Sequence, residues 1–196
     1  MKVDIKEVKK LKELAGVGLT DAKQALEAAN GDFDKALAEM REKGLTKAEK
    51  RGDRETRSGI VDAYVHDGRI GAILELNCET DFVAKTPEFK ELAHYLAMQI
   101  ASMNPLYVAL ADVPEEQLKK VRAEAEKEVG DKPKEIKAKI VEGKVAKQFE
   151  EKVLYTQKYI LDDTKTVEDF IKTYIAKTGE NISVRQFKRI ELGVVE

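Results

Sequence analysis

Residues 60–78 read IVDAYVHDGRIGAILELNC, and this stretch decides how the central part of the chain folds. Asp67-Gly68 separates two runs rich in β-branched and apolar residues, a pattern that predicts a β-hairpin closed by a two-residue turn. Pairing residue 66 with residue 69 gathers the apolar side chains on one face, which we expect to be the core side. That face would carry Val61, Ala63, Val65, Ile70, Ala72, Leu74, Leu76 and Cys78.

The hairpin leads into a short loop, Asn77-Cys78-Glu79-Thr80-Asp81-Phe82-Val83, which places a large aromatic side chain beside two carboxylates. Two interpretations of Phe82 are open. Aromatic residues are mostly buried, which favours a core residue folded under the loop by about two to one. An exposed aromatic residue on a stiff support would instead be an anchor for the pocket of a partner protein.

A helix should follow this loop, because Thr86 and Pro87 are typical of a helix start and Asn104-Pro105 of a helix end. Its apolar stripe should lie on the hairpin. The stripe consists of Phe89, Leu92, Ala93, Leu96, Ile100 and Met103.

Residues 1–45 predict three short helices that form a compact bundle resembling a ubiquitin-associated domain. Asp4 with Glu7, Thr20 and Asp32 are the expected caps. The expected ends are Gly16, Asn30-Gly31 and Gly44. The apolar positions are Ile5, Val8, Leu11 and Leu14 in the first helix, Ala22, Ala25, Leu26 and Ala29 in the second, and Phe33, Ala36, Leu37 and Met40 in the third.

Two strongly charged segments interrupt the apolar periodicity. Residues 46–58 contain eight charged residues out of 13 and predict a linker. Residues 114–152 contain 11 basic and 10 acidic residues and only narrow apolar stripes such as Leu118, Val121 and Ala125, which predicts a charged helical arm or helix pair. We expect breaks in this arm at Gly130, Pro133 and Gly143.

The last part of the chain should return to the sheet. Residues 155–161 look extended, and Thr166 with Asp169 predicts a capped helix that ends at Gly179. Ile182, Val184, Ile190 and Leu192 share one parity and predict a terminal strand that joins the hairpin in an antiparallel sheet. Gln186 and Lys188 break that parity, so the middle of the strand should be an edge or a bulge. The fold class is therefore α+β, with a core domain over residues 59–196.

Composition limits the function. The 35 basic and 37 acidic residues nearly balance, so the chain has no overall positive field that would hold a polyanion such as nucleic acid. The expected partner is therefore a protein. One cysteine, no apolar amino-terminal segment and no membrane-spanning run indicate a cytoplasmic protein away from membranes. No phosphate-binding loop, metal-ligand spacing or catalytic constellation is present, so we expect no cofactor, no metal and no enzymatic chemistry.

Three motifs together carry a family resemblance. They are Cys78-Glu79-Thr80-Asp81-Phe82-Val83-Ala84-Lys85, then Gly16-Val17-Gly18 before Asp21-Ala22-Lys23-Gln24-Ala25-Leu26, and Lys177-Thr178-Gly179-Glu180-Asn181-Ile182. In their order along the chain, and over nearly all of it, these motifs resemble translation elongation factor Ts in its short form. The resemblance implies a guanine-nucleotide exchange factor for elongation factor Tu.

The resemblance also implies which residues meet the partner. Asp81 and Phe82, within Thr80-Asp81-Phe82-Val83, would intrude near the magnesium and phosphate site of elongation factor Tu and dislodge the ion. An amino-terminal contact would involve Val17, Gly18, Leu19 and Lys23, and a carboxy-terminal loop contact Gly179, Glu180 and Asn181. Long family members contain a second core half for which this chain has no room. The chain resembles the short members, which dimerise to supply that half, so a homodimer is expected.

Two departures and one alternative accompany this assignment. Leu19-Thr20 stands where relatives often carry two methionines, and Arg185-Gln186 stands where they often carry a basic pair. The alternative function is a non-enzymatic adaptor that holds a peptide or ubiquitin-like partner through its amino-terminal helices. An adaptor would not need the aromatic loop at Phe82.

Overall fold

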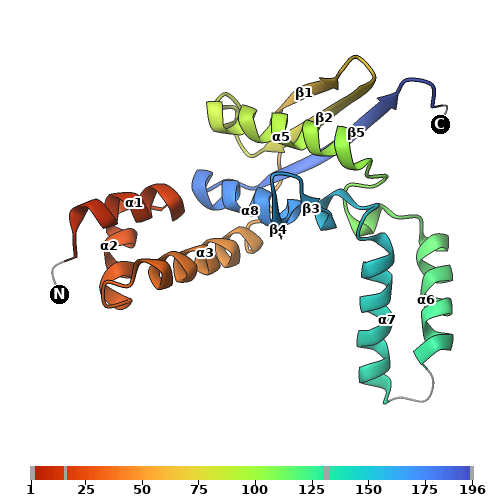
Figure 1. Ribbon diagram of the computed structural model, residues 1–196, viewed down its shortest axis with the longest axis horizontal. Coiled ribbons are helices and arrows are strands. Elements are labelled where there is room, and N and C mark those ends of the chain that lie inside the picture. Colours follow the sequence, from red (N-terminus) through yellow and green to blue (C-terminus); the bar gives the residue numbers. More distant parts are fainter. Residues whose placement is uncertain (1–2, 16, 130–132, 195–196) are drawn as a thin grey trace.

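The computed structural model describes residues 3–15, 17–129 and 133–194. An amino-terminal group of helices, a central sheet covered by helices and a protruding helix pair follow one another through the chain (Figure 1). The mixture of helices with a small antiparallel sheet confirms the predicted α+β class. Within the described residues, no helix has the length and apolar character that crossing a bilayer requires.

The amino-terminal helices are α1 (Ile5–Ala15), α2 (Leu19–Ala28) and α3 (Phe33–Glu49). They enclose a small core of their own, and small alanine side chains on α2 allow the helices to approach closely. Ile5 and Leu14, predicted on the same stripe of α1, are instead exposed. The buried residues are Val8, Leu11, Ala22, Ala25, Leu26, Ala29, Ala36 and Met40.

The helix starts follow the prediction in part. Asp32 caps α3 by accepting a 3.0 Å hydrogen bond from the Lys35 N–H, and Asp4 accepts one of 2.9 Å from the Lys6 N–H. Thr20 as a cap is wrong, because α2 already begins at Leu19 with extended Gly18 at the N-cap position. The predicted helix end at Gly16 lies outside the described residues.

The predicted end of the third helix at Gly44 is also wrong. Helix α3 continues to Glu49, because the Lys and Ala residues that follow favour helix and offset the cost of a single glycine. Gly44 faces helix α8 (Val167–Thr178), where an added Cβ would lie 3.3 Å from the Ala176 Cβ. Ala48 is buried in the main core, so α3 connects the amino-terminal helices directly to the central domain.

The hairpin consists of β1 (Ser58–His66) and β2 (Ile70–Cys78). Asp67 and Gly68 both have positive φ, and the Arg69 N–H donates to the His66 carbonyl at 2.9 Å, as the predicted turn requires. The ladder, however, pairs His66 with Ile70 rather than Arg69. The predicted register is therefore wrong by one residue.

This slip exchanges the two faces of β1, because successive side chains of a strand point to opposite faces. Ile60 and Tyr64 pack on the core, whereas Val61 and Val65, predicted in the core, are exposed. Strand β2 keeps its predicted face, with Ala72, Leu74, Leu76 and Cys78 buried.

Strand β5 (Ile182–Glu191) completes the sheet by pairing antiparallel with β2, which gives the order β1-β2-β5. The register shifts between Glu75 and Leu76, and Arg185 is the additional residue on β5, so the predicted bulge is confirmed. Before the bulge Ile182 and Val184 are buried. After it the parity reverses, which leaves Ile190 exposed and contradicts its predicted place on the same face.

Helices α5 (Pro87–Met103) and α8 cover the sheet, with α5 on β1 and β2 and α8 on β5 (Figure 1). The Thr86 hydroxyl accepts from the Phe89 N–H at 3.2 Å, and Thr166 and Asp169 form the predicted capping box of α8. Residues 155–161, predicted as extended, are only partly so, because the segment begins in a 3₁₀ turn (Leu154–Thr156). It continues in β3 (Lys158–Tyr159), which pairs with β4 (Asp162–Thr166).

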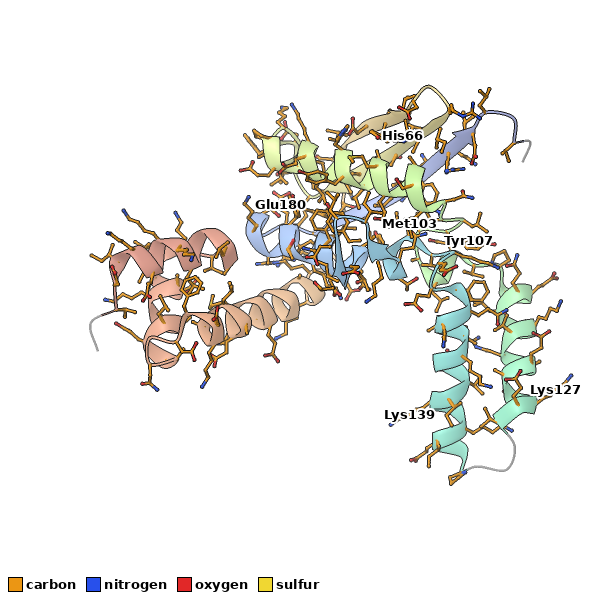
Figure 2. All side chains as sticks on the ribbon, viewed as in Figure 1. His66, Met103, Tyr107, Lys127, Lys139 and Glu180 are labelled. Carbon is orange, nitrogen blue, oxygen red and sulfur yellow. The ribbon has the colours of Figure 1, made fainter. Side chains whose placement is uncertain are left out.

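The predicted arm is a helix pair, α6 (Glu115–Val129) and α7 (Lys134–Phe149), that extends away from the sheet (Figure 1). Figure 2 places Lys127 and Lys139 on this arm, far from Glu180 at the end of α8. The predicted break at Gly143 is wrong, since α7 passes through it, and the break at Gly130 lies outside the described residues. A narrow seam that includes Val121, Ala125 and Val145 holds the pair together.

Candidate functional site

The loop after β2 contains a four-residue helix, α4 (Asp81–Ala84), that carries Phe82. The Phe82 side chain is 81% exposed, so the interpretation of this residue as part of the core is wrong. An aromatic ring presented in this way is unusual unless a binding partner covers it.

The carboxyl end of α4 is anchored on the core. Ala84 is buried and Val83 packs against the main cluster. The Thr86 hydroxyl donates to the Val83 carbonyl at 2.8 Å while it caps α5, and so ties the two helices together. Phe82 therefore projects from a fixed base, with Asp81 also exposed beside it.

Asp81 precedes the exposed ring and pairs with Lys85 one turn later. The Lys85 ammonium lies 2.6 Å from the Asp81 carboxylate, and this hydrogen bond lowers the pKa of Asp81. Asp81 is therefore ionised at neutral pH. The site presents a negative charge next to an apolar ring, the combination predicted to approach a bound cation and its ligands.

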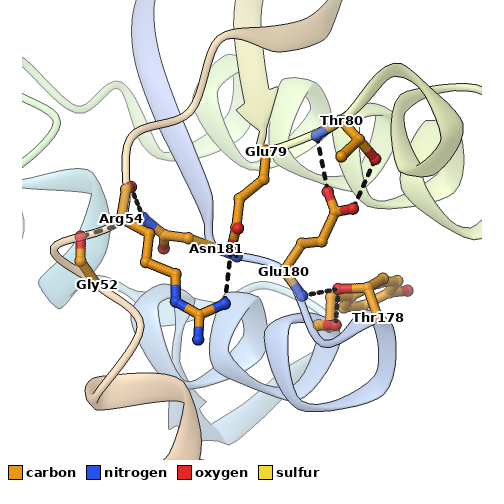
Figure 3. A network of polar contacts seen from close by, with 8 residues as sticks. Gly52, Arg54, Glu79, Thr80, Thr178, Glu180 and Asn181 are labelled. Carbon is orange, nitrogen blue, oxygen red and sulfur yellow. Dashed lines mark hydrogen bonds and ion pairs between the residues drawn. The ribbon is translucent and has the colours of Figure 1, made fainter.

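The amino end of α4 is held by a residue distant in sequence. Both carboxylate oxygens of Glu180 accept hydrogen bonds from Thr80, one from its N–H at 2.9 Å and one from its hydroxyl at 2.6 Å (Figure 3). The structure thus brings together two of the three predicted contact segments, Thr80-Asp81-Phe82-Val83 and Gly179-Glu180-Asn181.

Asn181 lies at the centre of the same network and is 5% exposed. Its side-chain amide donates to the carbonyls of Gly52 and Arg54, at 3.1 and 2.7 Å, and its N–H donates to the Glu79 carboxylate at 2.7 Å (Figure 3). Arg54 also pairs with Glu79 at 3.4 Å. Segment 52–54, the Phe82 loop and the α8–β5 connection are therefore fastened to one another.

Cys78 closes the base of the loop from inside the core. Its thiol donates to the Thr80 carbonyl at 3.1 Å, and burial, with a smaller contribution from the negative charge of Glu180, raises the pKa of the thiol to about 11. Such a thiol is protonated at neutral pH and packs as an apolar group, as the sequence predicts.

The amino-terminal segment predicted to contact the partner lies beside the carboxy-terminal loop. Val17, Gly18 and Gly179 all line one groove of about 490 Å³ between α2, α3 and α8. Leu19 is exposed on the same segment, and Lys23 pairs with Glu27 at 3.8 Å. The three predicted contact segments thus form neighbouring parts of the structure.

Sequence reasoning missed several residues that shape this site. Arg54 and Gly52 belong to the predicted linker, and no pattern in that charged stretch singles them out. Lys85 could have been found, because a lysine four residues after an aspartate is a common helical ion pair. Among the described residues, no group of three or more histidine, cysteine or acidic side chains has the geometry to hold a metal ion.

Comparison with known proteins agrees with the motifs at this site. The family model described as "Elongation factor TS" matches residues 4–194. A protein of Thermotoga maritima named Elongation factor Ts is 54% identical over 194 residues, which covers 98% of each chain. Proteins of the same name from Pseudothermotoga lettingae and Coprothermobacter proteolyticus are each 48% identical over 98% of this chain, and over 99% and 100% of their own lengths.

Proposed function

The chain belongs to the elongation factor Ts family, and from this premise we propose how it promotes guanine-nucleotide exchange on elongation factor Tu during translation elongation. Phe82, with Asp81 beside it, enters the nucleotide domain of elongation factor Tu near the magnesium and phosphate site and dislodges the ion. The observation that supports this proposal is the exposure of Phe82 on a helix anchored at both ends.

Exchange of this kind requires no bond-making chemistry. The factor needs only to bind the nucleotide-free or distorted partner more tightly than the GDP-bound partner, because the coupling between the two ligands is reciprocal. The apolar area of Phe82 supplies binding energy in the distorted state, and the anchored helix limits its retreat. Asp81 adds a negative charge where the magnesium ion and its ligands lie.

The other two segments support a wider contact surface. Val17, Gly18, Leu19 and Lys23 would meet the partner from the amino-terminal module, whose three helices we liken to a ubiquitin-associated domain. Gly179 lines the same groove as Val17 and Gly18, which favours a single continuous surface. We propose that the chain is divided by function into the amino-terminal module (residues 1–45), a connecting segment (46–58) and the core (59–196). Helix α3 extends across the boundary between the module and the connecting segment.

A nucleotide-release assay tests this proposal. Elongation factor Tu loaded with fluorescent GDP is mixed with excess unlabelled GDP, with and without the protein, and release is followed by fluorescence. The rate of GDP release should rise in proportion to the concentration of the protein, even when the protein is present in smaller amounts than elongation factor Tu. Unchanged release at saturating concentration would refute the function. Membership of the family gives the adaptor alternative no support.

We also propose that the protein works as a homodimer in the cytoplasm. The sheet face opposite α5 carries exposed apolar side chains from all three strands, which a second copy would cover. They are Val61, Val65, Ile73 and Ile190. Light scattering at micromolar concentration should give the mass of two chains, and a single species at the mass of one chain would contradict the proposal.

A further inference from the structure

Helix α4 is too short to be stable on its own. Isolated helices below about 12 residues are marginal in water, and α4 has four. Thr80 occupies its N-cap position, but its side chain makes no capping bond within the helix, and its N–H and its hydroxyl both donate to Glu180. The amino end of the helix that carries Phe82 is therefore fixed by a side chain from elsewhere in the chain.

Glu180 is suited to hold Thr80 because it uses both carboxylate oxygens. Its Oε2 accepts from the Thr80 N–H at 2.9 Å and its Oε1 from the Thr80 hydroxyl at 2.6 Å. Two bonds from one carboxylate to one residue fix orientation as well as distance. Thr80 thereby acquires a defined position relative to α8 before any partner arrives.

The loop that carries Glu180 is itself fixed. Gly179 ends α8 with a φ of 79°, a conformation that favours glycine. The Glu180 N–H donates to the Thr178 hydroxyl at 3.3 Å, and buried Asn181 next to it makes the three bonds to Gly52, Arg54 and Glu79. Glu180 therefore holds the amino end of α4 in a fixed position relative to α8 and the residues bonded to Asn181.

From this geometry we propose that Glu180 is a positioning residue, which aims Phe82 at the partner through Thr80. The proposal rests on the proposed function of Phe82, and it assigns Glu180 a different role from the partner contact that the resemblance implies. Both of its oxygens are already occupied by Thr80, so an intact network leaves its carboxylate engaged within the protein.

Two substitutions separate positioning from direct contact. Glu180→Ala removes both bonds, so the maximal rate of stimulated GDP release should fall about 10-fold as Phe82 loses its fixed geometry. Glu180→Gln keeps the shape and removes the charge. Its amide oxygen can accept from the Thr80 N–H while its NH₂ donates to the Thr80 hydroxyl, so it should recover most of the rate.

A double-mutant cycle with Phe82→Ala provides a second test. If Glu180 acts through Phe82, the variant with both Glu180→Ala and Phe82→Ala should release GDP no more than about twofold more slowly than Phe82→Ala alone. Glu168→Ala serves as the control, because Glu168 is an acidic residue of α8 that pairs with Lys172 at 2.9 Å, away from the Phe82 loop. It should release GDP at the parental rate.

Hydrogen exchange of the Thr80 amide reports the bond without any partner. It should accelerate at least about 10-fold in Glu180→Ala and stay near the parental rate in Glu180→Gln. Parental activity of Glu180→Ala, equal losses in both variants, or losses that add in the cycle would overturn the proposal. Failure of the proposed function would look different, because the parent would then not stimulate release while the Thr80 amide would still respond to Glu180→Ala.

Discussion

Replacing Phe82 with alanine should separate partner binding from folding. With 81% of its surface exposed, the ring has about a fifth of its area covered in the free protein. For a side chain that buries roughly 200 Å² when enclosed, this is about 40 Å². At about 25 cal/mol per Å² the covered area contributes about 1 kcal/mol to the free energy of unfolding.

The exposed area of the Phe82 ring gives the expected loss of binding free energy in the complex with elongation factor Tu. A partner pocket that encloses the remaining roughly 160 Å² gains about 4 kcal/mol, of which alanine retains a part. We therefore expect Phe82→Ala to weaken binding to nucleotide-free elongation factor Tu by about 2 to 4 kcal/mol, in the range of aromatic hot spots. Stimulated GDP release should slow by a factor of about 30 or more.

Two measurements on the purified variant check this expectation, the rate of GDP release and the thermal midpoint. Phe89→Ala is the matched control, because Phe89 is a completely buried phenylalanine of α5 and its removal should cost about 3 to 5 kcal/mol of stability. A Phe82→Ala protein that melts as early as Phe89→Ala, yet exchanges nucleotide at the parental rate while folded, would refute the reasoning.

Three further outcomes are expected. The raised pKa of Cys78 means that the folded state holds the thiol proton more tightly than the unfolded state, so stability should fall as pH rises from 9.0 to about 11. Cys78→Ala should flatten this part of a denaturation profile, and a profile that the substitution leaves unchanged would show that the pKa of Cys78 is not raised on folding. Gly143→Ala should raise the free energy of unfolding by about 0.5 to 1 kcal/mol in chemical denaturation, because α7 is helical there and a Cβ meets open space; a destabilised variant would contradict the continuous helix. Val65→Lys combined with Ile190→Glu should give monomers by light scattering if the exposed sheet face joins two copies, whereas persistent dimers would place the interface elsewhere.

The sequence predicted correctly those features that a few neighbouring residues determine. The Thr86 and Thr166 caps, the Asp67-Gly68 turn and the helix end at Gly179 each arise within a few residues, and all are present. The antiparallel sheet formed by the hairpin and the terminal strand also followed from hydrophobic patterning, whereas the pairing of that strand with β2 was not predicted. The exposure of Phe82 could not be predicted, since burial statistics favour the opposite outcome.

The errors come from interactions between distant segments. The register of β1 was wrong because the turn alone favours pairing residue 66 with 69, while packing of Ile60 and Tyr64 on the core selects the alternative. The helix end at Gly44 is the exception, since the lysine and alanine residues that follow it favour helix and offset the cost of one glycine. The bonds of Glu180 to Thr80 connect residues that no local pattern relates.

The bulge at Arg185 gives strand β5 one position at which its length can change without exchanging its two faces. Deleting this one residue would leave Val184 opposite Leu76 next to Gln186 opposite Glu75, so the alternation would become uniform while Ile182, Val184, Phe187 and Arg189 all kept the face they have now. The Arg189 guanidinium would then keep its 3.0 Å hydrogen bond to the Ala101 carbonyl at the end of α5. A deletion within either half of β5 would instead turn part of the strand from the inside of the molecule to the outside.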